Sequence, residues 1–167
     1  MSFYLAVVSP LDTPLFEAQF TSGKGAPASA STSSFPSWSS FSNGSDAATP
    51  STPGAPAGST PGLEKHLLQM IAHASLDAVE EVSEGTASLY LKAVDRHNEW
   101  TVSAFIAGNV KFILLHDTKN DDGIRLFFGE VWELYVKASL SPFQTVNTPI
   151  RNPAFDTKVR ASAKRYL

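Results

Sequence analysis

The side chains in this sequence that are best suited to chemistry gather between positions 66 and 77. His73 and Asp77 are four residues apart, and His66 precedes His73 by one heptad, so on a helix they could begin a metal site. No third or fourth ligand follows at a spacing known from metal sites. Ser75 is near His73 in sequence but would lie on another helical face, so the two cannot act as nucleophile and base. We interpret these residues as a polar helix face.

The common signatures of catalysis are missing from the sequence. It contains no glycine-rich phosphate loop, no G-x-S-x-G and no H-E-x-x-H. His116 and Asp117 end a predicted strand, where we expect them to be satisfied by hydrogen bonds. We therefore predict that the chain is not an enzyme, and we assign it no catalytic, cofactor-binding or metal-binding residue.

Acidic residues extend the polar face towards the end of the same predicted helix. Carboxylates at a helix C-terminus oppose the macrodipole. Solvation alone explains a polar stripe, but an acidic patch kept at a mild electrostatic cost is also typical of a docking surface. As a hypothetical partner interface we take the four residues that recur at i, i+4, i+7 and i+11: His73, Asp77, Glu80 and Glu84.

That helix is predicted to span residues 63–82. Thr60 can act as its N-cap and Pro61 can occupy its first position, where a missing N–H is harmless. Apolar residues at helical spacing define the face that we expect on the sheet: Leu63, Leu67, Met70, Ile71, Ala74 and Ala78.

Alternation of apolar residues predicts the sheet beneath this helix. Residues 3–8 and 110–115 are apolar on both faces, so they are predicted to be central strands covered from both sides. Residues 15–20 alternate and residues 89–96 carry charges, as edge strands do. A Gly-Asn dipeptide links residues 100–107 to the next strand in a hairpin. The predicted fold is α/β (α+β), with a five-stranded, mainly antiparallel sheet in the order 2-1-5-4-3.

Two more helices are predicted near the C-terminus. Residues 124–141 carry a wide apolar stripe and stop at Pro142. Residues 153–166 form a shorter helix with Phe155 and Val159 as its anchors. A central sheet that is apolar on both sides requires helices on both faces.

Residues 22–62 differ in composition from the rest of the chain. Of these 41 residues, 35 are Ser, Thr, Ala, Pro or Gly, which is too little apolar surface to offset the entropy of ordering. We predict a disordered low-complexity insertion within one domain. Phe35, Trp38 and Phe41 are evenly spaced in it, either by chance or as a short partner-binding motif.

Charge and composition limit the remaining function classes. The chain has 167 residues, a net charge of −3 and no cysteine, which excludes disulfides and thiolate zinc sites. Residues 151–167 carry five basic residues and one acidic residue, against −7 elsewhere, so nucleic-acid binding is poorly supported. This basic C-terminal helix is either a solvated face or a docking site for an acidic or membrane surface. We recognise no signal peptide and no membrane span.

Several long pieces of the sequence, in register, resemble the sedlin family, the small longin-like subunits of the TRAPP complex. The order of elements is also that of the family. The resemblance covers everything except residues 22–62, an insertion that compact members lack. It is carried by Phe3-Tyr4, by Asp12-x-Pro14-x-Phe16-Glu17, and by HLLQMIAHASLDAVEE, LYLKAVDRHNEWTVSAFI, KFILLHD, DGIRLFFGEVWELYVKASLSPF and NTPIRNPAFDTKVRASAKR.

The resemblance implies a single longin-like domain over residues 1–167, with one helix on one face of the sheet and two on the other. It implies a non-catalytic adaptor of a complex that tethers vesicles between endoplasmic reticulum and Golgi and activates a Rab-type GTPase. The expected partners are a neighbouring small core subunit and the larger complex-specific subunits. The expected location is the cytoplasmic side of ER–Golgi membranes, reached through the complex. Asp77 matches the family's acidic position at a partner-facing surface.

Two alternative hypotheses share this architecture. The chain could be another longin-type trafficking module, either a small clathrin-adaptor chain or a SNARE-like longin domain. A SNARE would need a long heptad segment and a membrane anchor after the domain, and we find neither. A small-molecule-binding profilin- or PAS-like domain would need a pocket with converging polar groups.

Overall fold

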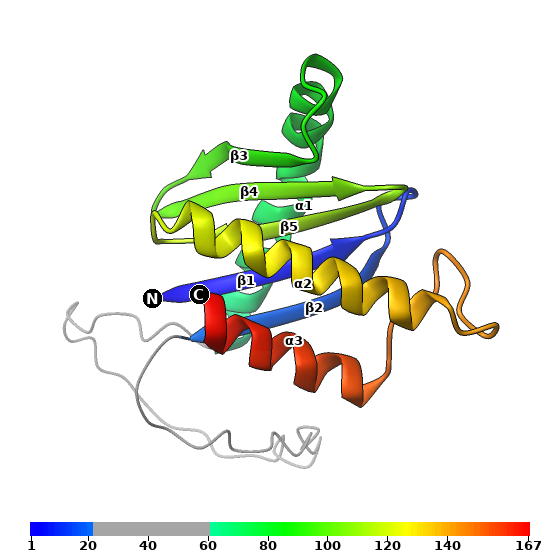
Figure 1. Cartoon of the computed structure of the whole chain (residues 1–167). Coiled ribbons are helices and arrows are strands. Elements are labelled where there is room, and N and C mark those ends of the chain that lie inside the picture. Colours follow the sequence, from blue (N-terminus) through cyan, green and yellow to red (C-terminus); the bar gives the residue numbers. More distant parts are fainter. Residues whose placement is uncertain (22–60) are drawn as a thin grey trace, which may run out of the picture.

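A five-stranded sheet with helices on both faces forms the described part of the chain (Figure 1). The computed structural model describes residues 1–21 and 61–167, and in the first helix it describes side chains from residue 64 onwards. In chain order the elements are β1 (Ser2–Val8), β2 (Pro14–Thr21), α1 (Pro61–Gly85), β3 (Tyr90–His97), β4 (Trp100–Ala107), β5 (Val110–His116), α2 (Asp121–Ser139) and α3 (Pro153–Tyr166).

The strand order is β2-β1-β5-β4-β3 and every neighbouring pair is antiparallel, which confirms the predicted order. Val110 pairs with Ala107 directly across the Gly-Asn turn between β4 and β5. Within that turn Gly108 has a φ of 61°, a left-handed conformation that glycine adopts without a steric penalty. The turn signal in the sequence was therefore interpreted correctly.

The two faces of the sheet are covered as the family resemblance implied. On β1, Phe3, Leu5 and Val7 pack in one cluster with α2 and α3. The alternate residues Tyr4 and Ala6 pack in another cluster with α1. Figure 1 shows α2 and α3 together on the near side of the sheet, with α1 crossing the strands on the far side. One helix on one face and two on the other follow from this alternation.

The helix α2 contributes more buried residues to the near-side core than α3 does. Its predicted apolar stripe is buried at Ile124, Phe127, Phe128 and Val131. The helix begins three residues earlier than predicted, because the Asn120 side chain accepts a hydrogen bond from the Gly123 amide at 3.2 Å and caps it. In α3 both predicted anchors are buried, and Ser162 and Ala163 join them.

The prediction for the buried face of α1 was wrong in most of its positions. Of the described residues assigned to the sheet, Ile71 is buried, but Leu67, Met70 and Ala74 are exposed and Ala78 is half-buried. The actual buried face is rotated about the helix axis relative to the predicted face, and it includes a serine. Its members are Leu68, Ile71, Ala72, Ser75, Leu76 and Val79. Ser75 is accommodated because its hydroxyl donates to the Ala72 carbonyl at 2.8 Å.

The edge strand β3 contains an irregularity that the sequence did not predict. Its pairing with β4 shifts register between Leu91 and Asp95, and Ala93 there has a φ of 47°. The Ala93 amide donates to the Ser103 hydroxyl on β4 at 3.3 Å. The strand is therefore bulged towards a polar group inside the sheet.

The predictions on residues 22–60 lie outside the described residues. They comprise disorder of the insertion, the roles of Phe35, Trp38 and Phe41, and the capping by Thr60. The helix predicted over residues 63–82 is observed as α1 over Pro61–Gly85, so it begins two residues earlier than predicted.

Candidate docking surface on helix α1

The outward face of α1 combines exposed apolar and acidic side chains. Leu67 and Met70 are 45% and 62% exposed, although both are large apolar residues like the buried Leu68. Asp77 lies directly opposite the buried face, with Ala74 one turn before it. Exposed apolar side chains gathered beside charged ones are typical of a surface that a partner covers. We call Leu67, Met70, His73, Ala74, Asp77 and Glu84 the α1 outer face.

All four residues of the predicted interface are exposed on α1. For Asp77 and Glu84, no hydrogen bond or ion pair with another described residue is found. His73 borders a cavity between α1 and β1. Their role as an interface stays a prediction, and Leu67 and Met70 are neighbours that the sequence had assigned to the core.

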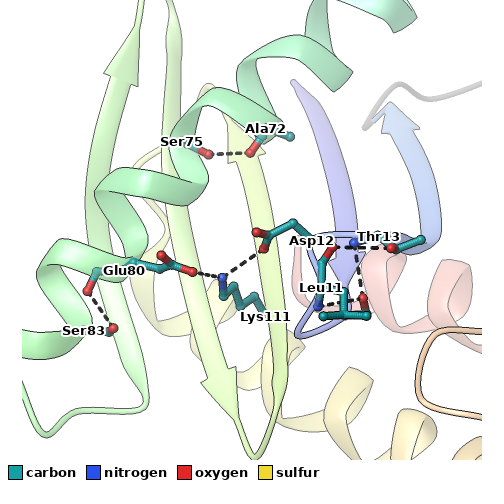
Figure 2. A network of polar contacts seen from close by, with 9 residues as sticks. Leu11, Asp12, Thr13, Ala72, Ser75, Glu80, Ser83 and Lys111 are labelled. Carbon is teal, nitrogen blue, oxygen red and sulfur yellow. Dashed lines mark hydrogen bonds and ion pairs between the residues drawn. The ribbon is translucent and has the colours of Figure 1, made fainter.

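Glu80 differs from the other three because it is bonded to the sheet. Its carboxylate pairs with the ammonium group of Lys111 at the start of β5, and the same group reaches Asp12 in the β1–β2 turn at 3.1 Å (Figure 2). Burial lowers the pKa of Lys111, but its hydrogen bonds to Glu80 and Asp12, together with their charges, raise it on balance. Lys111 thus joins α1, β5 and the β1–β2 turn.

The other residues considered for chemistry are not arranged for it. His116 is buried and both of its ring nitrogens have partners, the Ser103 hydroxyl and the Thr118 carbonyl. Asp117 accepts a hydrogen bond from the Ser2 amide at 3.0 Å. Over residues 1–21 and 61–167, no group of three or more His, Cys, Asp or Glu side chains is placed to hold a metal ion.

The basic C-terminal helix is partly engaged with the fold. Arg160 forms an ion pair with Asp156 at 2.9 Å, and its guanidinium lies 5.9 Å from the ring centre of Phe20. Its Nη1 also approaches the Gln19 carbonyl at 3.4 Å. Lys158 and Lys164 remain exposed. None of the helices that the structure describes is long and apolar enough to cross a bilayer.

Comparison with known proteins identifies relatives over most of the chain. The model of the Sedlin family matches residues 7–165. A "probable trafficking protein particle complex subunit 2" of Drosophila melanogaster is 48% identical over 104 residues, which are 62% of this chain and 75% of that protein. The Caenorhabditis elegans protein of the same name is 34% identical over 166 residues, 99% of this chain and 96% of its own length. A "transport protein particle 20 kDa subunit" of Schizosaccharomyces pombe is 45% identical over 106 residues, 63% of this chain and 78% of that protein.

Proposed function

The chain belongs to the sedlin family, and from this premise we propose that it is a non-catalytic subunit of a TRAPP vesicle-tethering complex. Relatives in a fly, a worm and a fission yeast carry the name of a trafficking or transport particle subunit, which supports this proposal. The subunit acts in traffic between endoplasmic reticulum and Golgi. It is peripheral to those membranes and is held there by the complex.

The observation that carries the proposal is the α1 outer face. Leu67 and Met70 expose apolar surface next to Asp77, on the side of the helix that turns away from the sheet. A surface of this kind suits a partner with an apolar contact area and a complementary basic group. We assign this face to a larger, complex-specific subunit. A neighbouring small core subunit binds elsewhere on the domain, so that the chain links the two.

The adaptor role also fits the chemistry of the described residues. The sequence contains no glycine-rich phosphate loop that would bind a nucleotide. The buried polar pair of Ser103 and His116 is inaccessible to a substrate. In the proposal, the isolated subunit binds partners and leaves exchange to the assembled complex.

Co-purification from the source cell with charge-reversed variants tests this proposal. Asp77→Arg should leave the fold intact and strongly reduce recovery of the larger TRAPP subunits, because a like charge would face the partner's basic group. Glu133→Arg is the matched control, since Glu133 is also an exposed helical carboxylate, on α2 and on the other face of the sheet. Equal recovery with Asp77→Arg and the control would remove α1 from the interface. Absence of every TRAPP subunit from the wild-type sample would overturn the function itself.

A further inference from the structure

A cavity of about 350 Å³ lies between the first half of α1 and the β1–β2 hairpin. Its wall includes Tyr4 and Ala6 from β1, Glu17 from β2, and Gln69, Ala72 and His73 from α1. The helix crosses the strands steeply (Figure 1). The cavity lies on the α1 side of the sheet at the β2 end, because its lining residues come from α1, β1, β2 and the turn between the two strands. The cavity is distinct from the α1 outer face, although His73 borders both.

The hydroxyl group of Tyr4 is the most unusual feature of this cavity. Tyr4 is only 1% exposed, yet its hydroxyl has no hydrogen-bond partner among the described residues. Burial, and then the negative charge of nearby Glu17, raise the pKa of this phenol, so it stays neutral. Buried hydroxyl groups nearly always have a partner in folded proteins. The Tyr4 hydroxyl is therefore available to a group that enters the cavity.

The charges around the cavity determine which kind of chemical group could bind in it. Glu17 is half-buried and accepts a hydrogen bond from the Gln69 amide at 2.7 Å on one carboxylate oxygen, while Lys65 approaches that same oxygen only to 4.0 Å. For the second oxygen of Glu17, no partner is found among the described residues. Asp12 also lines the cavity, and its ion pair is with Lys111 outside it. No lysine or arginine is part of the wall within the described residues.

Apart from Gln69 and His73, the rest of the wall is apolar. Ala6, Val8, Ala72 and Leu76 form its sides, so that Tyr4 and Glu17 offer their acceptors beside an aliphatic surface. Long basic side chains have this same division, because an aliphatic stem packs on apolar surface while the charged end seeks acceptors. A carboxylate and a neutral hydroxyl together are suitable acceptors for an ammonium or guanidinium group.

We propose that this cavity receives a lysine or arginine side chain of a partner protein. The aliphatic stem of the guest packs against Ala6, Ala72 and Leu76, and its charged end donates hydrogen bonds to the Tyr4 hydroxyl and the free oxygen of Glu17. This site goes beyond the proposed function, since its occupancy does not depend on whether the α1 outer face binds a TRAPP subunit.

The test is a titration of the isotope-labelled full chain with capped pentapeptides, in which binding is measured from the shifts of amide resonances in NMR spectra. The peptides carry lysine, arginine, norleucine or glutamate at the centre, between glycine and serine residues. We expect saturable shifts at Ala6, Glu17 and Ala72 with the basic peptides, at an affinity at least about five-fold above that of norleucine. Equal binding of norleucine, or preference for glutamate, would overturn the proposal. So would saturation by free n-butylammonium without any binding of peptides, which indicates a site for small cations.

Two variants connect the binding to the proposed acceptors. Glu17→Gln should weaken the lysine peptide about ten-fold, and Tyr4→Phe should weaken it about three-fold. Tyr4→Phe should not lower the melting temperature, because it removes a polar atom that has no partner. This variant therefore tests whether the peptide binds at the proposed acceptors even if Glu17→Gln folds poorly. Glu133→Gln, on the other face of the sheet, is the control and should change nothing. Unchanged affinity in both cavity variants would place the peptide elsewhere.

Discussion

Ser103 on β4 and His116 on β5 are hydrogen-bonded to each other inside the sheet, with 2.9 Å between the Ser103 oxygen and the His116 Nε2 atom. The other ring nitrogen lies against the Thr118 carbonyl, which can only accept, so Nδ1 carries the proton of the neutral ring. Nε2 is then the acceptor for the Ser103 hydroxyl. The Ser103 hydroxyl can donate its hydrogen bond to Nε2 only while His116 is neutral.

Stability should consequently fall in mild acid. Burial lowers the pKa of His116 below its ordinary value of 6.5, against the opposing effects of the Thr118 carbonyl, Asp121 and Asp117. As the pH falls, the unfolded chain takes up a proton on His116 at a higher pH than the folded chain does. The stability that depends on neutral His116 is therefore fully present above about pH 6.5 and is lost as the pH falls towards the folded pKa. Urea unfolding between about pH 7.5 and about pH 5.5 measures this slope. His116→Gln should reduce it, and the same substitution at the exposed His66 is the control. A slope unchanged by His116→Gln would contradict the assignment.

Replacing Ala93 with glycine should stabilise the fold or leave its stability unchanged. Ala93 has a φ of 47°, a region that disfavours a side chain with a Cβ atom, and its amide is held there by Ser103. Ala93→Gly should raise the free energy of unfolding by up to about 1 kcal/mol, or leave it unchanged where the greater entropy of the unfolded chain offsets the relief. Chemical denaturation measures this change. A loss above about 1 kcal/mol would show that the Ala93 methyl group packs usefully.

The ion pairs of Lys111 should stabilise the contact between α1 and the sheet. The side chain is 13% exposed, while its partners Asp12 and Glu80 are about half exposed. Because solvent screens the partners, we expect Lys111→Met to lower the free energy of unfolding by only about 1 kcal/mol. A double-mutant cycle with Glu80→Gln should give a coupling of about 0.5 kcal/mol. Zero coupling would mean that the contact seen in Figure 2 adds nothing to stability.

Adjacent leucines on α1 should respond in opposite ways to the same substitution. Leu68 is 3% exposed and Leu67 is 45% exposed. Leu68→Asp should lower the free energy of unfolding by about 3–5 kcal/mol, because it places a charge in the core. Leu67→Asp should change it by less than about 1 kcal/mol and should weaken partner capture instead. Melting temperature and co-purification, measured on both variants, distinguish these outcomes. Reversed results would restore the face first predicted from the sequence.

The sheet could be predicted from the sequence because strands report burial in a simple way. Residues such as Phe112 and Ile113 are adjacent and both apolar, and this is possible in a strand only when both faces are covered. Each face then needed helices, and the remaining apolar segments were the only ones to supply them. The order of strands followed from which ones were apolar on both faces and which ones alternated or carried charge.

The face of α1 could not be predicted in the same manner. Apolar residues surround much of this helix, so Leu67 and Met70 looked as suitable for the core as Leu68 and Leu76. Ser75 counted against the true face, since its local hydrogen bond to Ala72 is visible only in three dimensions. The pairing of Lys111 with Asp12 and Glu80 joins positions distant in sequence, which residue type alone does not reveal.

The pairing of β1 with β5 has a kinetic consequence for this chain. The strands β3, β4 and β5 are joined by short turns and can pair early in folding. Pairing of β1 with β5 instead brings together Phe3 and His116, which are separated by most of the sequence. Every residue between β2 and α1 lengthens the loop that this encounter closes. Because closure entropy depends on the logarithm of loop length, residues 22–60 should slow the completion of the sheet only by roughly a factor of two relative to a chain without them. These residues should therefore delay folding slightly and leave the contact order of β3, β4 and β5 unchanged.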